Sequence, residues 1–333
     1  MKIIRILLCP IVPIYYVVTW LRNVLYNKGV LSSKSYNFPV ICVGNLSTGG
    51  TGKTPMIEYL IRLLKDEKQI ATLSRGYKRK TNGFVLADTT ANADTIGDEP
   101  FQFFSKFKDV TVAVDTDRQN GIHQLRSLKN KPEVILLDDA YQHRKVNAGF
   151  NILLTAYTNL YYKDVVLPTG NLREPRSGAK RANIIVVSKC KSDITKIEKQ
   201  EIVSKLKLQN HQQVFFSHIA YSETVISAYN ELKLKTLPKF TLVTGIANAK
   251  PLVDFLNKNG LQFSHLEYPD HYNFKPSDIK LLARKPLILT TEKDYVRLSV
   301  NENLKDKLYY LPIQLQLDQP KAFSNAVKAF ASF

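Results

Sequence analysis

The glycine-rich stretch from residue 43 to residue 55, VGNLSTGGTGKTP, constrains the fold of this chain more than any other feature. In the nucleotide-binding P-loop pattern G-x-x-x-x-G-K-[ST], the first Gly precedes the Lys by six positions. With Lys53 as that Lys, the first Gly position is occupied by Ser47. The stretch therefore departs from the strict pattern. Whether it is a phosphate-binding loop has to be judged from the segments on either side of it.

The flanking segments have the composition of a strand and a helix. Residues 38–43, FPVICV, are apolar and rich in β-branched side chains, which predicts a buried strand. Residues 53–68, KTPMIEYLIRLLKDEK, place apolar side chains on one helical face, namely Ile57, Leu60, Ile61 and Leu64. A P-loop lies between a strand and a helix in this order, so the context supports phosphate binding.

The residue types in the loop suit a phosphate cradle. Backbone N–H groups curl around phosphate oxygens at the N-terminus of the next helix, and Gly permits positive φ angles and close approach. Lys53 would neutralise the β- and γ-phosphates, and the Thr54 hydroxyl would bind Mg²⁺. A Gly-rich structural turn is the alternative, but G-K-T in this context favours a nucleotide site. The predicted nucleotide contacts are Ser47, Thr48, Gly49, Gly50, Thr51, Gly52, Lys53 and Thr54.

Two Asp residues end another apolar run, in VILLDD at residues 134–139. An Asp at a strand end is also a common helix cap, but beside a P-loop Asp138 and Asp139 are candidates for holding Mg²⁺. The nearest match to the guanine-reading motif N/T-K-x-D is VVSKCKSD, where Lys191 occupies the Asp position and Asp193 comes two residues late. We therefore expect ATP as the nucleotide.

The rest of the chain alternates apolar strand segments with segments of helix length. Continuous apolar strands of this kind indicate a mostly parallel sheet with helices on both faces. The strand-bearing segments of the first half are 70–80, 110–118, 132–146, 150–157 and 182–190. Those of the second half are 213–221, 240–260, 286–298 and 307–317, followed by a final helix in 320–333.

The predicted fold class is therefore α/β, with a P-loop NTPase-like sheet, a smaller second α/β domain and an N-terminal membrane-associated helix. A chain of 333 residues is long enough for two such domains. We divide it into residues 1–30, the N-terminal segment, residues 31–165, the nucleotide-binding domain, and residues 166–333, the C-terminal α/β domain.

The composition is strongly basic, with 47 Lys and Arg against 29 Asp and Glu and a net charge of +18. Such a balance indicates an acidic partner, namely nucleic acid, an anionic membrane or a phosphorylated substrate. The basic residues are scattered and match no nucleic-acid-binding module, so we expect no nucleic-acid partner. Cys9, Cys42 and Cys190 have neither disulfide nor zinc spacing and are predicted to be packed apolar residues in a reducing compartment.

The N-terminus has an apolar run from Ile6 to Leu21 between basic residues. The run is shorter than the roughly 20 residues that span a bilayer, and Pro10 and Pro13 interrupt it. No small-residue cleavage site follows it, which argues against a cleaved signal peptide. A buried core helix is the alternative, and we favour a segment that lies on or inserts into a membrane. The aromatic and basic residues that support this reading are Tyr15, Tyr16, Trp20, Lys2, Arg5, Arg22 and Lys28.

Polar clusters at predicted strand ends are candidates for the side of the site that receives the phosphoryl group. They include Arg75 in SRGYKRK, Asp98 and Glu99 in TIGDEP, and Arg118 in DTDR. A kinase needs a carboxylate or His to orient and deprotonate the attacking hydroxyl, together with cations near the transferred group. Asp98 and Arg75 suit these roles, although Asp98 and Glu99 in a solvated loop or at a helix N-terminus explain the same residues.

Seven segments in order give the chain a resemblance to a known family. They are VGNLSTGGTGKTP, LSRGYKRK, GDEP, LLDDAYQHR, LREP, DHYNF and TTEKDYVRL. Together they resemble the tetraacyldisaccharide 4′-kinase (lipid A 4′-kinase) family, over nearly the whole chain. Each segment alone is a weak signal, and the loop core G-G-x-G-K-T-P is the form usual in that family.

The resemblance implies a lipid kinase. Such enzymes transfer the γ-phosphate of ATP to the 4′-hydroxyl of a tetraacylated glucosamine disaccharide 1-phosphate, which gives lipid IVA in lipopolysaccharide assembly. The resemblance also implies a Mg²⁺ requirement and a site between two α/β domains. It places the enzyme at the cytoplasmic face of the inner membrane, where its basic surface would meet anionic lipids. We expect a monomer.

The resemblance further assigns roles to individual residues. Asp98 matches the catalytic Asp of the family, and His271 in DHYNF matches its partner. Asp138 and Asp139 match the metal-side acids, while Gln142, Arg173 and Glu174 match other positions that line the site. To these we add Lys53 and Arg75 as catalytic candidates, Glu99 as a metal ligand and Arg118 as a substrate contact.

One segment departs from the family pattern. Where D-D-G-F-Q-H is expected, the chain has Ala140 in place of Gly, followed by Tyr141. Ala lacks the freedom of Gly at positive φ, so the local turn can differ from the family form. His143 in the same segment is either a ligand contact or a packed histidine, and we favour the packed one.

Two other functions use the same motifs. A membrane-associated P-loop ATPase that acts as a switch or partitioning module would bind ATP without a sugar-facing Asp or His. A basic nucleic-acid-binding ATPase would need a clustered basic surface. We expect the lipid kinase, because only that reading uses Asp98, His271, the apolar N-terminus and the basic charge together.

Overall fold

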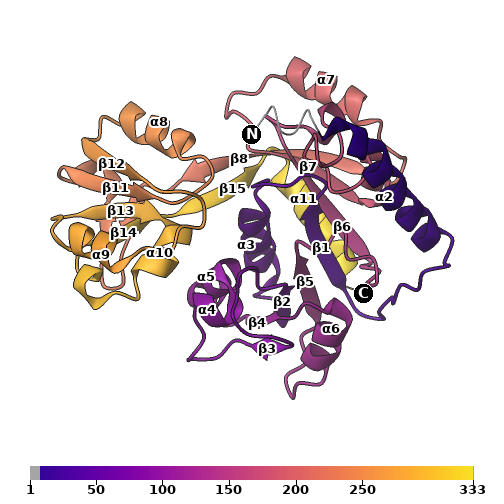
Figure 1. The fold of residues 1–333 in the computed structure, drawn as a ribbon, viewed down its shortest axis with the longest axis horizontal. Helices are drawn as coiled ribbons and strands as arrows, with labels where there is room; N and C mark the ends of the chain where they lie inside the picture. The colour runs from indigo at the N-terminus through magenta and orange to yellow at the C-terminus, as the bar shows by residue number, and fades with distance from the viewer. Residues whose placement is uncertain (1–7, 333) are drawn as a thin grey trace.

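The computed structural model describes residues 8–332. Within this range the strands form one nine-stranded and one six-stranded sheet, and each sheet is the centre of a separate lobe (Figure 1). Lys2 and Arg5, which we predicted to flank the membrane segment, lie outside the described residues. The α/β fold with a mostly parallel first sheet is confirmed, and it resolves into two lobes of unequal size.

The larger lobe is built on the nine-stranded sheet, in the order β15-β8-β7-β6-β1-β5-β2-β4-β3. Its inner strands run parallel, and only the edge strands β3 and β15 pair antiparallel with their neighbours. The strands are β1 (Val40–Asn45), β2 (Ile70–Ser74), β3 (Val85–Leu86), β4 (Thr111–Val114), β5 (Val134–Asp138), β6 (Phe150–Ala156), β7 (Ile184–Ser188), β8 (Gln213–Tyr221) and β15 (Ile313–Leu317).

Helices cover both faces of this sheet because its strands are apolar on both sides. Alternate residues of β1 belong to different cores, with Val40 and Cys42 on one face and Ile41 and Val43 on the other. The first face packs against α6 (Arg118–Arg126) and α7 (Lys196–Leu206), and the second against α3 (Lys53–Leu64), α5 (Asp98–Lys106) and α11 (Pro320–Ala331). The predicted apolar face of α3 is buried as expected, with Ile57, Leu60, Ile61 and Leu64 at most 1% exposed.

The smaller lobe contains the six-stranded sheet, in the order β10-β9-β14-β13-β11-β12. Its strands are β9 (Thr224–Ile226), β10 (Glu231–Lys233), β11 (Phe240–Thr244), β12 (Phe263–Glu267), β13 (Ile288–Thr291) and β14 (Leu308–Leu311). Its helices are α8 (Lys250–Lys258), α9 (Pro276–Ala283) and α10 (Glu292–Leu298). The remaining elements of the described chain are the short helix α4 (Ala93–Ile96) and the 3₁₀ turns η1 (Cys9–Ile11), η2 (Tyr161–Lys163), η3 (Arg176–Arg181), η4 (Leu234–Thr236) and η5 (Glu302–Leu304).

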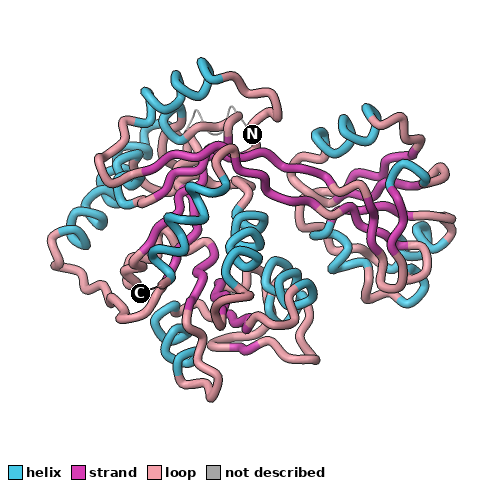
Figure 2. The backbone as a smooth tube through the Cα atoms, turned by 180° about the vertical axis from the view of Figure 1, so that it is seen from behind, coloured by secondary structure: helices cyan, strands magenta, loops and turns pink. Residues whose placement is uncertain are grey.

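A two-stranded ribbon joins the lobes. β8 leaves the large sheet and β15 returns to it, and the two pair antiparallel from Ser217 to Tyr221, which is visible from behind in Figure 2. The single closing strand predicted in 307–317 is two strands, because Pro312 separates β14 in the small sheet from β15 in the large one. The division we placed between residues 165 and 166 does not coincide with the division between the sheets, because β7, β8 and β15 belong to the large sheet.

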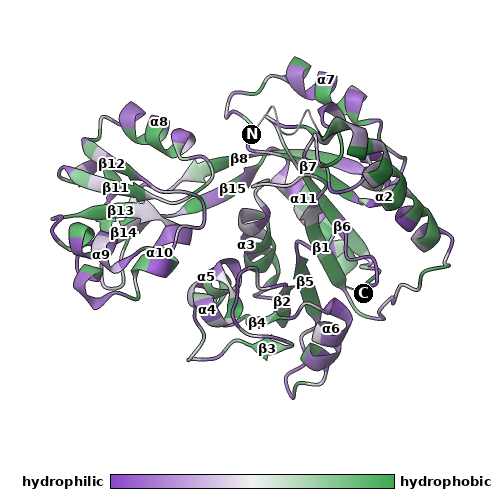
Figure 3. Ribbon diagram, viewed as in Figure 1, coloured by the Kyte–Doolittle hydropathy of each residue, from purple (hydrophilic) through white to green (hydrophobic). Residues whose placement is uncertain are grey.

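The N-terminal helix α2 (Val12–Asn27) lies on the outside of the large lobe and is largely apolar in Figure 3. Its exposed apolar side chains are Ile14, Tyr16, Val17, Val18, Trp20 and Leu21. Among the helices of residues 8–332, none has both the length and the apolarity required to cross a bilayer. The prediction that all three cysteines are packed is wrong for Cys9, which is exposed at the start of η1, whereas Cys42 and Cys190 are buried.

Candidate active site

The glycine-rich loop connects β1 to α3 and has the backbone of an anion cradle. Gly49 and Gly52 have φ angles of 106° and 88°, a region that residues with a Cβ rarely adopt. Ser47 is absent from the described residues with positive φ, and it pairs with Leu172 in an isolated antiparallel bridge. The first Gly of the strict P-loop pattern is therefore not needed in this chain.

The segment after Gly170 supports the loop from one side. The Thr48 N–H donates to the Asn171 carbonyl at 2.7 Å, and the Arg173 N–H donates to the Leu46 carbonyl at 2.7 Å. These bonds hold the start of the loop against the rest of the protein. Groups held in place in this way need little reorganisation when a ligand binds, which strengthens electrostatic binding.

The charged groups of the loop already form ion pairs with each other. Lys53 Nζ lies 3.5 Å from Asp139 Oδ1, and Arg173 Nη1 lies 2.9 Å from the same oxygen. Burial would raise the pKa of Asp139, but the two cations outweigh burial and hold this pKa below its ordinary value. Asp139 therefore keeps its negative charge beside the phosphate site and neutralises part of the positive charge there.

Asp138 is buried next to this group. Burial, followed by repulsion from Asp139, raises the pKa of Asp138 to about 7. Its Oδ1 has no hydrogen-bond partner among residues 8–332. A buried carboxylate oxygen without a partner is suited to bind a cation. No group of three or more His, Cys, Asp or Glu side chains converges on a metal position in the described chain. A Mg²⁺ ion here would depend on the Thr54 hydroxyl, the two Asp carboxylates, phosphate oxygens and water.

The turn after β5 explains why Ala140 is tolerated. The residue with positive φ is Asp139, at 49°, and Asp adopts this region more readily than most residues with a Cβ. Ala140 is absent from the described residues with positive φ and is 5% exposed. The freedom of Gly at position 140 is therefore not required for this turn.

A second lysine faces the phosphate loop from the end of β7. Lys189 has a φ of 56°, and its Nζ lies 3.6 Å from the point where a Cβ on Gly50 would stand. Burial lowers the pKa of Lys189, and the positive charge of Lys53 lowers it further. Lys189 forms no ion pair with any other residue of the described chain. Two ammonium groups at the mouth of one loop favour a polyanionic ligand between them.

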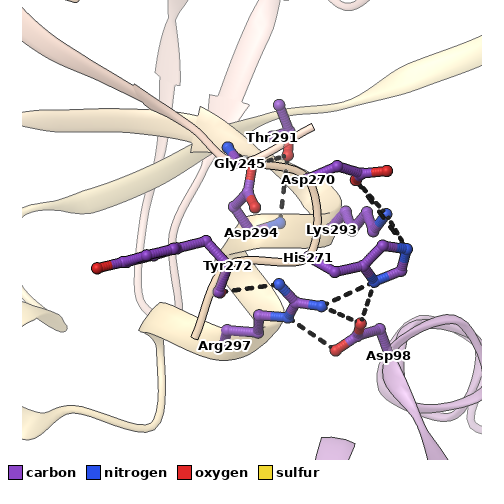
Figure 4. Close-up of polar contacts among 9 residues, drawn as sticks. All are labelled: Asp98, Gly245, Asp270, His271, Tyr272, Thr291, Lys293, Asp294 and Arg297. Carbon is purple, nitrogen blue, oxygen red and sulfur yellow. Dashed lines mark hydrogen bonds and ion pairs between the residues drawn. The ribbon is translucent and has the colours of Figure 1, made fainter. Parts of the chain in front are cut away.

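The other half of the site joins the two lobes and centres on Asp98 (Figure 4). Asp98 is the first residue of α5, and its Oδ2 lies 3.0 Å from His271 Nδ1 in the small lobe. Arg297 on α10 forms a two-pronged ion pair with the same carboxylate. Burial would raise the pKa of Asp98, but hydrogen bonds from His271 and Arg297 lower it to about 2.

The charge of Asp98 determines the tautomer of His271. An ionised carboxylate only accepts hydrogen bonds, so His271 Nδ1 carries the proton in its contact with Asp98. Nε2 then has a lone pair and accepts a hydrogen bond from Lys293 Nζ at 2.9 Å. Lys293 is itself paired with Asp270 at 3.0 Å. The φ of His271 is 57°, an uncommon backbone conformation that often marks functional sites.

The two halves of the site are adjacent. Glu99 follows Asp98 in the chain, and its charge raises the pKa of Asp138 in one half and of Arg297 in the other. The acidic end of β5 beside the glycine-rich loop thus lies close to a carboxylate–imidazole pair formed by both lobes. Such an arrangement can hold a phosphoryl donor and orient a hydroxyl acceptor in one place.

The two predicted arginines of the large lobe differ in exposure. Arg75 is exposed after β2 and makes no ion pair with the described residues, so it is free to reach a ligand. Arg118 is 3% exposed and donates to the Asp115 carbonyl at 2.6 Å. Burial lowers the pKa of Arg118, while the charges of Asp138 and Asp139 oppose this change. Arg118 therefore lies under the acidic end of β5 and not on an open surface.

Gln142 and Glu174 connect the site to the N-terminal helix. Gln142 Nε2 donates to the Asn45 carbonyl at 2.8 Å and to Glu174 Oε1 at 3.0 Å. Asn23 on α2 donates to Glu174 Oε2 at 2.6 Å, and Arg181 forms an ion pair with the same carboxylate. Glu174 is 2% exposed, so its visible role is to tie α2 to the loops around the phosphate site.

His143 agrees with our interpretation of a packed histidine. It is half-buried, burial lowers its pKa, and its Nε2 has no hydrogen-bond partner within residues 8–332. No described contact links it to the phosphate loop or to Asp98.

Three residues in the site were missing from our sequence-based list, namely Lys189, Lys293 and Arg297. Lys293 and Arg297 both lie in TTEKDYVRL, and their spacing of four residues puts them on one face of a helix. Lys189 is the Lys of the segment that we compared with the guanine-reading motif. Each of these residues lies in a motif that we noted. The residue it contacts, however, is more than 20 positions away in sequence, so the contact could not be predicted without the fold.

Comparison with known proteins identifies the family. The family model described as tetraacyldisaccharide-1-P 4′-kinase matches residues 4–332. A tetraacyldisaccharide 4′-kinase of Flavobacterium johnsoniae is 52% identical over an alignment of 320 positions, which covers 94% of this chain and 93% of that protein. The corresponding Bacteroides fragilis protein is 45% identical, over 90% and 85% of the two chains.

A solved structure shows the same fold. It is the crystal structure of an "apo" form of LpxK from Aquifex aeolicus in complex with ATP. It superposes with a TM-score of 0.80 at 31% identity, covering 98% of this chain and 99% of the other. The phosphate loop, the acidic strand end and the cluster around Asp98 thus belong to a fold whose relative holds ATP. Together, these matches show that the chain belongs to the tetraacyldisaccharide 4′-kinase family.

Proposed function

We propose that this chain transfers the γ-phosphate of ATP to the 4′-hydroxyl of an acylated glucosamine disaccharide 1-phosphate. The product is lipid IVA, an intermediate in lipid A assembly. The family match and the names of the relatives support this reaction. The single observation that carries the proposal is the position of the Asp98–His271 pair next to a phosphate loop.

The nucleotide side of the reaction is assigned to the loop and its cations. Backbone N–H groups between residues 49 and 54 would surround the phosphates, with the N-terminus of α3 behind them, while the Thr48 N–H stays bonded to the Asn171 carbonyl. Lys53 would exchange its ion pair with Asp139 for the β- and γ-phosphates, and Lys189 would approach the phosphate chain from the other side of Gly50. Arg75 is exposed and would supply a cation to the transferred group.

The metal requirement fits the residues that are present. Thr54, Asp138 and Asp139 would hold Mg²⁺, and the Glu99 carboxylate would lie next to them. When bound, the ion supplies positive charge that neutralises the phosphate oxygens during transfer. The observation that supports this cation is the buried Oδ1 of Asp138, which has no hydrogen-bond partner among the described residues.

The acceptor side is assigned to Asp98 and His271. The 4′-hydroxyl would donate its hydrogen bond to Asp98, which receives the proton while the hydroxyl oxygen bonds to the γ-phosphorus and ADP departs. A carboxylate with a pKa of about 2 is a weak base, so it orients the hydroxyl first and takes the proton late in the transfer. Nδ1–H of His271 holds the carboxylate in place for this step.

The location follows from the substrate and from α2. A multiply acylated sugar stays in the bilayer, so an enzyme that acts on its head group gains by lying on the membrane surface. The exposed apolar side chains of α2 would enter the interface, with Arg22 and Lys28 near anionic head groups. Because the reaction would use cytoplasmic ATP, this surface would face the cytoplasmic side of the inner membrane. The hydrogen bonds from Tyr15 to Arg173 and from Asn23 to Glu174 hold α2 next to the site, so a lipid bound at α2 would be close to it.

A transfer assay tests the proposal. Purified protein, labelled ATP, Mg²⁺ and the acylated disaccharide 1-phosphate in mixed micelles should give labelled lipid, and Lys53→Ala should not. Folded protein that binds ATP yet labels no lipid would refute the kinase. That result would favour the ATPase switch, which predicts ATP turnover without an acceptor.

A further inference from the structure

Arg297 contacts the proposed catalytic carboxylate from the opposite lobe. Its Nε donates to Asp98 Oδ1 at 2.9 Å, and its Nη2 forms an ion pair with Asp98 Oδ2 (Figure 4). The two residues are 199 positions apart, one at the start of α5 and the other on α10. A fork of two parallel N–H bonds fixes the plane of a carboxylate as well as its position.

The remaining groups of Arg297 are also held. Its Nη1 donates to the Tyr272 carbonyl at 2.9 Å, on the chain segment that carries His271. Its Nη2 lies 3.0 Å from His271 Nδ1. With Nδ1 protonated, this second approach is a packing contact between two donors that share one acceptor, Asp98 Oδ2. One guanidinium thus sets the relative positions of Asp98 and the His271 loop.

These contacts leave the Asp98 carboxylate little freedom to rotate. Its side chain is 9% exposed, and His271 and Arg297 occupy lone pairs on both oxygens. The remaining lone pairs are the places where an acceptor hydroxyl can bind. An Asp at the first turn of a helix would otherwise rotate, and small displacements from the attack geometry strongly reduce the rate.

We propose that Arg297 is a cross-lobe positioning residue that holds Asp98 in the orientation that receives the acceptor hydroxyl. The proton acceptor is then complete only when α10 lies against α5, so the packing of the small lobe assembles the acceptor half of the site. This inference rests on the proposed kinase function. It assigns Arg297 no contact with substrate and no part in proton transfer.

A second contact between α5 and α10 separates this role from general packing. Glu292, at the start of α10, pairs with Lys106 at 2.7 Å and accepts from Gln102 at 2.9 Å. These residues join the same two helices without touching Asp98 or His271. Glu292→Gln removes the ion pair with Lys106 at the same interface and leaves Asp98 and His271 untouched, so it serves as the matched control for Arg297 variants.

The experiment measures lipid phosphorylation for wild type, Arg297→Ala, Arg297→Lys and Glu292→Gln, with ADP affinity measured separately. In Arg297→Ala we expect kcat to fall about 100-fold, with KM for both substrates within about threefold. ADP affinity should stay within about twofold, because the phosphate loop is intact. Arg297→Lys keeps one donor and should recover part of the loss. Millimolar guanidinium should raise kcat of Arg297→Ala but not of Asp98→Ala.

Several outcomes would overturn the inference. A kcat of Arg297→Ala within about threefold of wild type would show that Asp98 needs no such support. A normal kcat with a raised KM for the disaccharide would make Arg297 a substrate contact instead. An equal fall in kcat for Glu292→Gln would show that the fall in Arg297→Ala comes from weaker packing between the lobes and not from the position of Asp98. If Arg297→Ala does not fold, Arg297→Gln takes its place, and the same fall in kcat is expected. A wild type without transfer activity refutes the proposed function itself, whereas an active wild type with an unaffected Arg297 variant refutes only this inference.

Discussion

Lys53 and Arg173 bind the same oxygen of Asp139, at 3.5 Å and 2.9 Å. The lysine of the glycine-rich loop is therefore held by a carboxylate and not by a loop carbonyl. In the proposed reaction, a triphosphate would replace this partner with more negative charge. The charge of Asp139 would then be available to a metal ion.

Lys53→Ala should reduce lipid phosphorylation by at least about 100-fold, because we propose that Lys53 neutralises charge that grows on the phosphates during transfer. Single-turnover assays at saturating ATP separate this loss from weaker binding. The Lys53→Arg variant keeps the positive charge, so comparison with Lys53→Ala shows how much of the effect comes from losing that charge. Near-normal single-turnover rates for Lys53→Ala would remove Lys53 from the catalytic set.

Asp98→Ala should lower kcat by about 100- to 10,000-fold, the range expected for loss of a general base. ADP affinity should be nearly unchanged, because Asp98 contacts His271 and Arg297 and not the phosphate loop. Calorimetry with ADP and the transfer assay give the two quantities. A parallel fall in ADP affinity would place Asp98 in nucleotide binding.

Lys189→Ala should weaken ATP and ADP binding by about tenfold, because a desolvated ammonium that binds phosphate contributes on the order of 1–2 kcal/mol. Without nucleotide, its melting temperature should equal or exceed that of wild type, since the variant removes repulsion with Lys53. A purely structural lysine would give a lower melting temperature and unchanged affinity.

Lys191→Ala is the matched control for this lysine. Lys191 is two residues farther along the same loop, and its exposed ammonium lies 4.0 Å from Glu198. It should leave nucleotide affinity unchanged. Equal effects of the two variants would show that general surface charge, and not a contact at Gly50, attracts the nucleotide.

Stability should depend on pH through Glu292. Burial, followed by the charge of Glu58, raises the pKa of Glu292 from 4.5 to about 7. Because the folded state binds this proton more tightly, the stabilisation is full below pH 4.5 and is lost as the pH rises to about 7. Denaturant titrations of metal-free protein at several pH values measure this loss.

Glu292→Gln should remove that part of the pH dependence. Asp138 contributes with the same sign, since its pKa is also raised, so the difference between the two stability curves isolates Glu292. Parallel curves for wild type and variant between pH 5 and pH 7 would contradict the assignment.

The membrane role of α2 is tested without deleting the helix. Ile14 and Val18 are 65% and 60% exposed, and replacing both with Glu should release the protein from anionic vesicles while ADP binding persists. Ile197→Glu, at a 77% exposed position on α7, is the control. Vesicle sedimentation that is equal for all three proteins would show that another surface binds the membrane.

The sequence predicted the parts of the site that are local in the chain. The strand, loop and helix around Lys53 follow from periodicity and Gly spacing, and Asp138 and Asp139 follow from their place after an apolar run. Ser47 was the doubtful residue, and the structure shows why it is acceptable, since the positive φ angles fall on Gly49 and Gly52.

The contacts across lobes could not be predicted from residue patterns alone. His271 was assigned only through family resemblance, and Arg297 was not assigned although its motif was noted. Both depend on the ribbon formed by β8 and β15, which brings α10 to α5. The same ribbon explains the misplaced division at residue 165, because no composition change marks a strand that leaves one sheet for another.

The most direct test of the central claim is the position of the new phosphate. Mass spectrometric fragmentation of the lipid after incubation with ATP and Mg²⁺ should show one added phosphoryl group on the 4′-position of the distal sugar, with one ADP formed for each lipid phosphorylated. ADP and free phosphate without a phosphorylated lipid, or a phosphoryl group at another position, would contradict the account.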